Sequence, residues 1–381
     1  MFNSLDITNC FKNLIGWRNH YDTDEIPTLS EELTTSNSGE YFQDYHPALR
    51  LDLIQACIPT NRNLEEYLTE KTNNAIVQLV NQIISVRKYD NYSKETLNTE
   101  VLLLGYGWAK DTIVNESRFV GFRITPMNTE GLVISLDSIG FQFSEIQTDL
   151  TIYLYHSSKL SALKVFNFSS TEKLDWTWVQ EEINLHSQNS EFIGGSFILG
   201  YYQDDLSGQA INMTNFNWKS GPCGTCDGGI KRNRWKSFNK YASVQPIYVP
   251  SSSLNADKTV MDFRDSIVSY EKSWGMNLKI SAKCDLTDFI CNHKNTLKKA
   301  LALKVTYLIL KDMQFSIQTN HIEEDLKSLI IRDLEGDKDT NYINIVDSLI
   351  MEIEGINFDH SGVSNPCLPC KNTNAPKYGV A

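Results

Sequence analysis

The fold is decided by three short runs in the middle of the chain: Phe119-Val120-Gly121-Phe122-Arg123-Ile124, Leu132-Val133-Ile134-Ser135-Leu136 and Thr151-Ile152-Tyr153-Leu154-Tyr155. These runs are rich in β-branched and aromatic residues, which favour strands. Similar runs recur after polar turns, at 139–143, 165–168, 176–179 and 197–202. Short strands at this spacing are typical of an antiparallel sandwich. We therefore predict a central antiparallel β-sandwich over residues 100–250.

The segments on both sides of the strands have helical patterns. Asn63 followed by Glu66 resembles a capping box, and the apolar residues from Leu64 to Ile83 recur at helical spacing. Further helical patterns cover Cys284–Met313, Glu323–Leu334 and Tyr342–Ile353. The predicted fold class is α+β, and three regions make it up: a helical N-terminal segment (1–95), the sandwich (100–250) and a helical C-terminal region (255–381) with an extended tail.

Composition limits the function classes. A chain of 381 residues with 41% hydrophobic and 22% charged residues can bury more than one core, so general disorder is not expected. A formal net charge of −12 works against non-specific binding to nucleic acids or anionic membranes. The polar N-terminus does not resemble a signal peptide, and no apolar run approaches the roughly 20 residues of a membrane span. We expect synthesis in the cytoplasm and no membrane insertion.

Two Cys-x-x-Cys motifs are the sharpest local signal. They supply Cys223 and Cys226, and then Cys367 and Cys370. Four thiolates form the set that a structural Zn²⁺ ion prefers, and such a site would fasten the tail to the β-region. Disulfides within or between the pairs and unligated thiols are the alternatives, because the two motifs lie far apart in the sequence. Reducing cytosol favours metal or free thiols over disulfides.

A thiol-dependent enzyme is a further reading of these cysteines, but the context does not support it. A thioredoxin-like motif opens a helix, whereas Cys226 is followed by Asp227-Gly228-Gly229. The sequence also lacks the nucleophile-elbow, phosphate-loop and zinc-protease motifs. We therefore expect no enzymatic activity, and we assign no catalytic residue.

Three groups of residues are candidate binding surfaces. Trp176 and Trp178, two residues apart, are either core or a platform for a sugar ring or a protein. A predicted loop from Lys231 to Lys240 places Arg232, Arg234 and Trp235 together; a subunit or intramolecular contact is favoured there over nucleic acid. An aromatic cluster supplies Tyr41, Phe42 and Tyr45 for docking or for a local core.

Several stretches resemble uncharacterised virion or tail-associated structural proteins of tailed bacteriophages and prophages. They are Ile139–Phe143, Leu154–Ser158, Gly200–Leu206, Cys284–Ile290 and Cys367–Cys370. The resemblance covers the chain from about residue 120 onward together with Tyr41–Ile84. It implies a virion component, present in several copies, that contacts itself and other virion proteins in a tail, neck or baseplate. The alternatives are a glycan- or cell-surface-binding sandwich and a metal- or thiol-dependent enzyme.

Overall fold

The computed structural model forms two compact units. It describes residues 2–19, 28–59, 62–87, 96–102, 109–187, 193–213, 230–315, 324–336, 341–356 and 366–368. The helical unit comprises residues 1–93, 286–364 and 368–381, and the sandwich unit comprises residues 94–285 and 365–367. Helices and antiparallel sheets are both present, which confirms the predicted α+β class.

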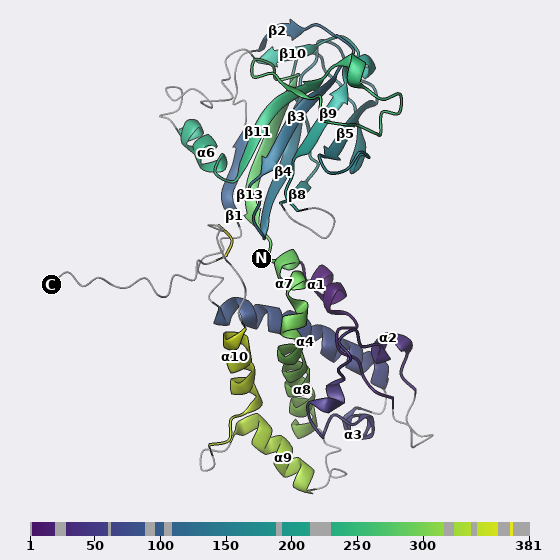
Figure 1. The fold of residues 1–381 in the computed structure, drawn as a ribbon, viewed down its shortest axis with the longest axis vertical. Coiled ribbons are helices and arrows are strands. Elements are labelled where there is room, and N and C mark those ends of the chain that lie inside the picture. Colours follow the sequence, from purple (N-terminus) through teal and green to yellow (C-terminus); the bar gives the residue numbers. More distant parts are fainter. Residues whose placement is uncertain are drawn as a thin grey trace, which may run out of the picture. The chain divides into compact units, whose positions relative to one another are not determined.

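The helical unit takes helices from both ends of the chain (Figure 1). The first segment contributes α1 (Ser4–Phe11), α2 (Glu31–Thr34), α3 (Leu51–Cys57) and α4 (Leu64–Val86). The second contributes α7 (Thr287–Asn292), α8 (Lys298–Phe315), α9 (Glu324–Glu335) and α10 (Ile345–Gly355). Short 3₁₀ turns lie at Phe42–Asp44 and Lys294–Leu297.

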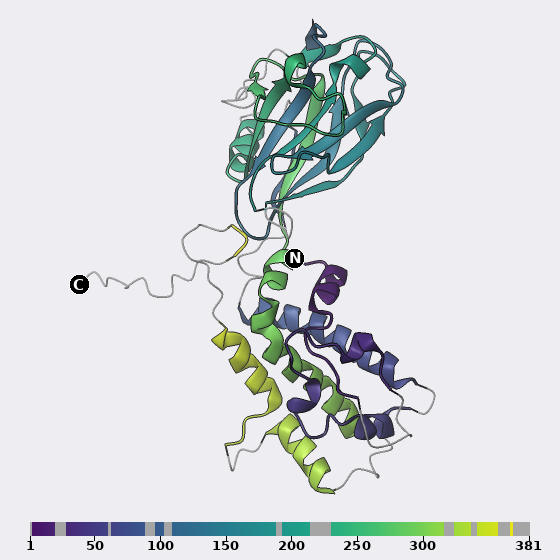
Figure 2. The same cartoon turned by 45° about the vertical axis from the view of Figure 1, so that its right-hand side comes forward.

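Helix α4 forms for the reasons that the sequence suggests. The side chain of its N-cap Asn63 accepts a hydrogen bond from the amide of Glu65 at 2.9 Å. The predicted apolar face is buried and consists of Leu64, Leu68, Ile76, Leu79, Val80 and Ile83. Helix α8 packs against α4 and against α10 (Figures 1 and 2), and one core cluster holds residues of both chain segments.

The sandwich unit is built from two antiparallel sheets. One contains β1 (Thr96–Leu102), β13 (Met276–Cys284) and β4 (Leu132–Phe141), with β7 (Thr177–Val179) and β8 (Ile183–His186) both pairing with β4. The other has the order β12 (Ile267–Val268), β11 (Ala242–Val249), β3 (Phe119–Pro126), β9 (Phe197–Tyr202), β5 (Leu150–His156), β6 (Lys164–Phe168). β2 (Ala109–Ile113) pairs with β10 (Ala210–Met213), and α6 spans Ile230–Phe238. The 3₁₀ turns are Gln203–Asp205 and Ser251–Ser253.

The main core of the sandwich unit contains residues from both sheets, and the opposite face of the six-stranded sheet carries a second, smaller core. Alternate residues of β3 divide between them: Val120, Phe122 and Ile124 join the first core, and Phe119 joins the second. The segment that follows β11 covers the second core with Met261. Two apolar layers therefore hold the central strands β3, β9 and β5.

The structure groups the chain differently from the three predicted regions. The two helical regions share one core, and the sandwich unit continues to residue 285 rather than stopping at 250. Cys284, read from the sequence as the start of a helix, ends strand β13. The strand has a period-two signal in its own residues, because Leu278, Ile280 and Ala282 face the core between polar neighbours. Apart from residues 366–368, the predicted extended tail lies outside the described residues.

Within the described ranges, no helix combines the length and the apolar character that crossing a membrane requires.

Candidate functional site

The outer face of the five-stranded sheet presents Trp178. Gly140 of β4 is the register partner of Trp178 in β7, and the indole lies directly on this glycine: a Cβ atom there would come within 2.9 Å of the ring. The ring centroid of Trp176 is 5.9 Å away at 30°, and both tryptophans are half-buried. The pair is therefore neither a fully buried core element nor an open platform.

One charged group lies over this indole, and others lie further along the same face of the sheet. The ammonium group of Lys279 lies 5.0 Å from the Trp178 ring centroid. Further along β13, Lys283 contacts Glu182 at 3.1 Å, and the hydroxyl of Ser281 donates a hydrogen bond to Asp137 at 2.9 Å. These lysines alternate with core residues, so they lie on the solvent side of the sheet.

We call the set Trp178, Lys279, Lys283, Asp137 and Glu182 the tryptophan face. On one face of the sheet it brings together one half-buried aromatic ring, two cations and two carboxylates. A ring face flanked by hydrogen-bonding groups suits a flat polar ligand such as a sugar. The assignment of Trp176 and Trp178 to ligand binding stays a prediction.

The aromatic cluster at Tyr41, Phe42 and Tyr45 is divided between core and surface. Phe42 is 1% exposed, and its ring centroid lies 4.8 Å from that of Trp17. Tyr41 is half-buried under the guanidinium group of Arg18, 4.6 Å from the ring centroid. Phe42 therefore has no surface for a partner, and only Tyr41 and Tyr45 retain some.

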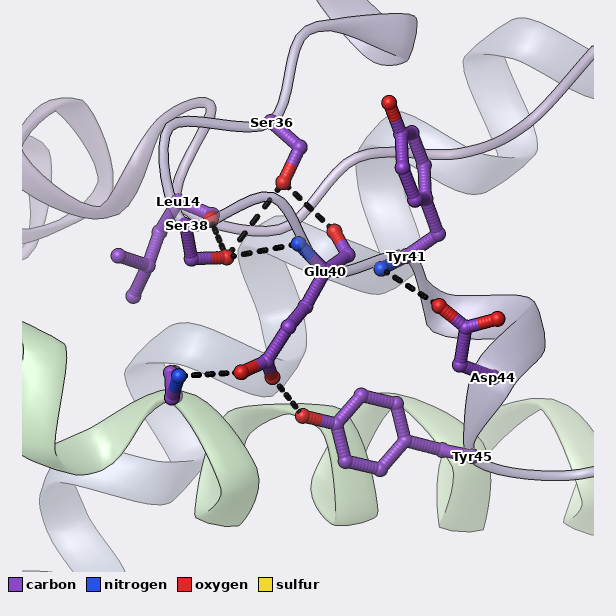
Figure 3. Close-up of polar contacts among 8 residues, drawn as sticks. Leu14, Ser36, Ser38, Glu40, Tyr41, Asp44 and Tyr45 are labelled. Atoms are coloured by element: carbon purple, nitrogen blue, oxygen red, sulfur yellow. Dashed lines mark hydrogen bonds and ion pairs between the residues drawn. The ribbon is translucent and has the colours of Figure 1, made fainter.

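Polar contacts hold this cluster in the helical unit (Figure 3). Glu40 accepts hydrogen bonds from the Tyr45 hydroxyl and the Lys298 ammonium group, which joins the N-terminal segment to α8. The bond from Lys298, followed by that from Tyr45, lowers the pKa of Glu40 below its usual value. Burial, followed by the bond to Glu40, raises the pKa of Tyr45. Both groups thus keep their ordinary charge near neutral pH.

The predicted cationic loop is helical over most of its length. Helix α6 spans Ile230–Phe238, and Arg234 is exposed on it. Trp235 and Phe238 are 3% and 0% exposed because they pack into the sandwich core. The indole of Trp235 has no open face for a stacked base. The side chain of Arg232 lies outside the described residues.

The cysteines pair in a way that the sequence did not indicate. Cys367 forms a disulfide with Cys284, a residue of neither motif, and Cys10 forms one with Cys291. Cys223, Cys226 and Cys370 lie outside the described residues. A sulfur in a disulfide is not a thiolate ligand, so a four-cysteine zinc site would require reduction of the Cys284–Cys367 bond. Zinc stays a prediction. Among the residues described, no three His, Cys, Asp or Glu side chains form a metal-binding group.

A buried polar cluster in the helical unit was missed by sequence reasoning. Nδ1 of His46 accepts a hydrogen bond from the amide of Ala48 at 3.0 Å, so Nε2 carries the proton and donates to Asp333 at 2.7 Å. The hydroxyl of Tyr342 donates to the other oxygen of Asp333 at 2.6 Å.

Burial lowers the pKa of His46, although the bond to Asp333 opposes this effect. Both ring nitrogens are occupied, so the imidazole would have to break a bond before it took a proton from a substrate. The arrangement serves to join His46 of the N-terminal segment to α9. No sequence motif marks it, because its members are almost 300 residues apart and meet only in the fold.

A small pocket also lies in the helical unit. Its volume is about 50 Å³, and it is lined by Phe11, Trp17, Phe42, Thr72 and Ile76 among others, with Lys12 and Glu32 paired at 2.8 Å on its border. Nε1 of Trp17 and the Thr72 hydroxyl have no hydrogen-bond partner among the described residues. The volume is that of a few water molecules, which such polar groups could bind.

Comparison with known proteins gives no match: no protein family, no curated protein and no solved structure is similar to the chain. The resemblance to virion proteins of tailed phages therefore stays a prediction.

Proposed function

We propose that the chain is a structural component of a phage particle, in a tail, neck or baseplate, that acts through interfaces with its own copies and with other virion proteins. The observation that supports this best is a set of large apolar side chains on the surface of the helical unit. Phe315 at the end of α8 is 73% exposed, Met351 on α10 is 56% exposed and Ile343 before α10 is 48% exposed. Protein interfaces are enriched in aromatic residues and methionine.

The amphipathic pattern of α10 sharpens this point. Its inner face carries Ile345, Leu349 and Ile353, which are buried, whereas Met351 faces solvent. An exposed methionine on a helix that already has a complete core face contributes little to folding. It is available to an interface at little cost to the unit.

Light scattering coupled to size-exclusion chromatography tests the proposal across a range of protein concentrations. The full chain should form a defined oligomer, and a Met351→Lys/Ile343→Lys variant should be a monomer with the circular dichroism spectrum of the folded chain. The matched control is Leu5→Lys, which places a charge at a position 67% exposed on α1. A chain that stays monomeric at every concentration, and that does not sediment with purified particles, contradicts the proposal.

A second candidate function, glycan or cell-surface binding by the sandwich, is supported by the tryptophan face. Trp178 has a half-buried ring that lies on Gly140, with the ammonium group of Lys279 5.0 Å from the ring centroid. Binding of the full chain to a glycan array should be lost in Trp178→Ala and reduced in Trp176→Ala. The control is Tyr270→Ala, an exposed aromatic residue of the same unit. Equal binding by Trp178→Ala and the unmodified chain would exclude this function for the face.

A further inference from the structure

The two disulfides lie in different units and have different surroundings. Cys10 and Cys291 belong to the helical unit, with Cα atoms 5.9 Å apart, and both are half-buried. Cys284 and Cys367 belong to the sandwich unit, with Cα atoms 5.5 Å apart, and they are only 2% and 0% exposed. One bond can thus be reached from solvent, and the other is closed inside a core.

The half-buried bond joins the two chain segments of the helical unit. Cys10 lies in α1 and Cys291 in α7, two helices in contact (Figure 1), and 281 residues separate the cysteines in the sequence. Two hydrogen bonds accompany it: the Asn3 amide donates to Thr287 at 2.8 Å, and Lys294 donates to the carbonyl of Cys10 at 3.0 Å. When the disulfide is reduced, only non-covalent contacts such as these hold the two segments together.

The buried bond belongs to the sandwich core. Cys284 is the last residue of β13, and Cys284 and Cys367 both belong to the core cluster between the sheets. An attacking thiolate must approach a disulfide sulfur directly, so this core must open before the bond is reduced.

We propose that Cys10–Cys291 is a redox-responsive fastener of the helical unit, and that Cys284–Cys367 is a permanent bond under the same conditions. In reduction, a glutathione thiolate attacks one sulfur of Cys10–Cys291 and forms a mixed disulfide, while the other sulfur leaves as a thiolate. A second glutathione thiolate then attacks the mixed disulfide. The products are two protonated cysteines and oxidised glutathione, a two-electron exchange.

The reverse reaction uses oxidised glutathione and re-forms the Cys10–Cys291 disulfide. The helical unit is consequently less stable in a reducing compartment. In an oxidising compartment the disulfide forms and the unit is more stable. This inference does not depend on the proposed role in a phage particle, because it rests only on the position and exposure of the two bonds.

Differential alkylation of the full oxidised chain tests the order of reduction. The protein is incubated with reduced glutathione, quenched at intervals and labelled with N-ethylmaleimide, and each cysteine is quantified by peptide mass spectrometry. Cys10 and Cys291 should be labelled together, at least about tenfold faster than Cys284 and Cys367. Labelling of both pairs at the same rate, or of Cys284 and Cys367 first, overturns the proposal.

A double variant tests the consequence of opening the bond. Cys10→Ser/Cys291→Ser should unfold its helical unit at a midpoint about 10 °C below that of the oxidised chain, and the midpoint should not respond to glutathione. Unmodified chain treated with glutathione should approach the same midpoint. Limited proteolysis during heating, followed at cleavage sites within residues 1–93, reports the unfolding of the helical unit. A double variant whose helical unit unfolds at the same midpoint as that of the oxidised chain also overturns the proposal.

Discussion

The sandwich unit is almost continuous in the sequence, whereas the helical unit is assembled from two segments that the sandwich separates. Strand pairs of the sandwich form within residues 96–284. In the helical unit, α8 finds its partner α4 more than 200 residues earlier in the chain. The sandwich also pairs strands that are distant in sequence, such as β1 with β13 and β3 with β11, but nearly all of its strands come from one continuous segment of the chain.

The largest expected effect is a break of the sandwich at its closest backbone contact. Gly121 of β3 and Gly200 of β9 are register partners, and a Cβ atom on Gly121 would overlap the carbonyl oxygen of Leu199. Because backbone cannot move aside as a side chain can, Gly121→Ala should cost about 4 kcal/mol or more of unfolding free energy. Urea unfolding followed by tryptophan fluorescence measures it.

The control for this substitution is Gly355→Ala at the end of α10, where an added methyl group meets nothing within 4 Å. It should leave the unfolding free energy unchanged or raise it slightly, because alanine favours a helix more than glycine does. Equal stability of Gly121→Ala and the unmodified chain would mean that β3 and β9 are not paired in this register.

The next largest effect tests whether the two distant segments share one core. Leu301 of α8 is 1% exposed and lines the same pocket as Phe11 and Ile76 of the N-terminal segment. Leu301→Ala should therefore destabilise the helical unit by about 3 kcal/mol, since it leaves a cavity at the joint of the segments. Leu5→Ala, at a position 67% exposed on α1, is the control.

Hydrogen exchange resolves the outcome by region. In Leu301→Ala, protection should fall in both α4 and α8, while strands such as β3 and β9 keep theirs. Loss of protection confined to α8 would show that the N-terminal helices form a core of their own.

Most secondary structure was predictable because it depends on local pattern. The apolar face from Leu64 to Ile83 and the strand at 119–124 are where the sequence placed them. Strand β13 was missed, although its residues alternate, because Cys284 and the residues after it read as a helix start. Helix α6 was missed because the five cations between Lys231 and Lys240, four of them in the helix, suggested a contact loop. In fact, Trp235 and Phe238, three residues apart, supply a buried face.

The candidate sites were less predictable, because their members meet only through tertiary contacts. Trp178 was selected from the sequence, but no pattern indicates that its ring lies on Gly140 beside Lys279. The pairing of Cys10 with Cys291 likewise follows from the association of α1 with α7. Cysteine spacing drew attention instead to the two Cys-x-x-Cys motifs.

A smaller effect concerns the pH dependence of the helical unit. Burial lowers the pKa of His46 in the folded chain, while the unfolded chain has a pKa of about 6.5. The unfolded state therefore binds more protons below that pH, and the unfolding free energy should fall as the pH drops from about 6.5 toward the folded pKa. A His46→Gln variant should lack this component. Urea unfolding at pH 5 to 8 compares the two, and identical pH profiles would contradict the prediction.

The smallest effect concerns the contact between Glu40 and Lys298, which also joins the two segments but lies near the surface. The side chains are 32% and 39% exposed, so solvent screens the pair, and Glu40→Gln should cost less than about 1 kcal/mol. The bonds from Lys298 and Tyr45 lower the pKa of Glu40, so this stability is present above the unfolded pKa and is lost as the pH falls through the folded one. Glu354→Gln, exposed on α10, is the control for charge alone. A loss as large as that of Leu301→Ala would mean that polar contacts contribute as much as the shared apolar core to holding the segments together.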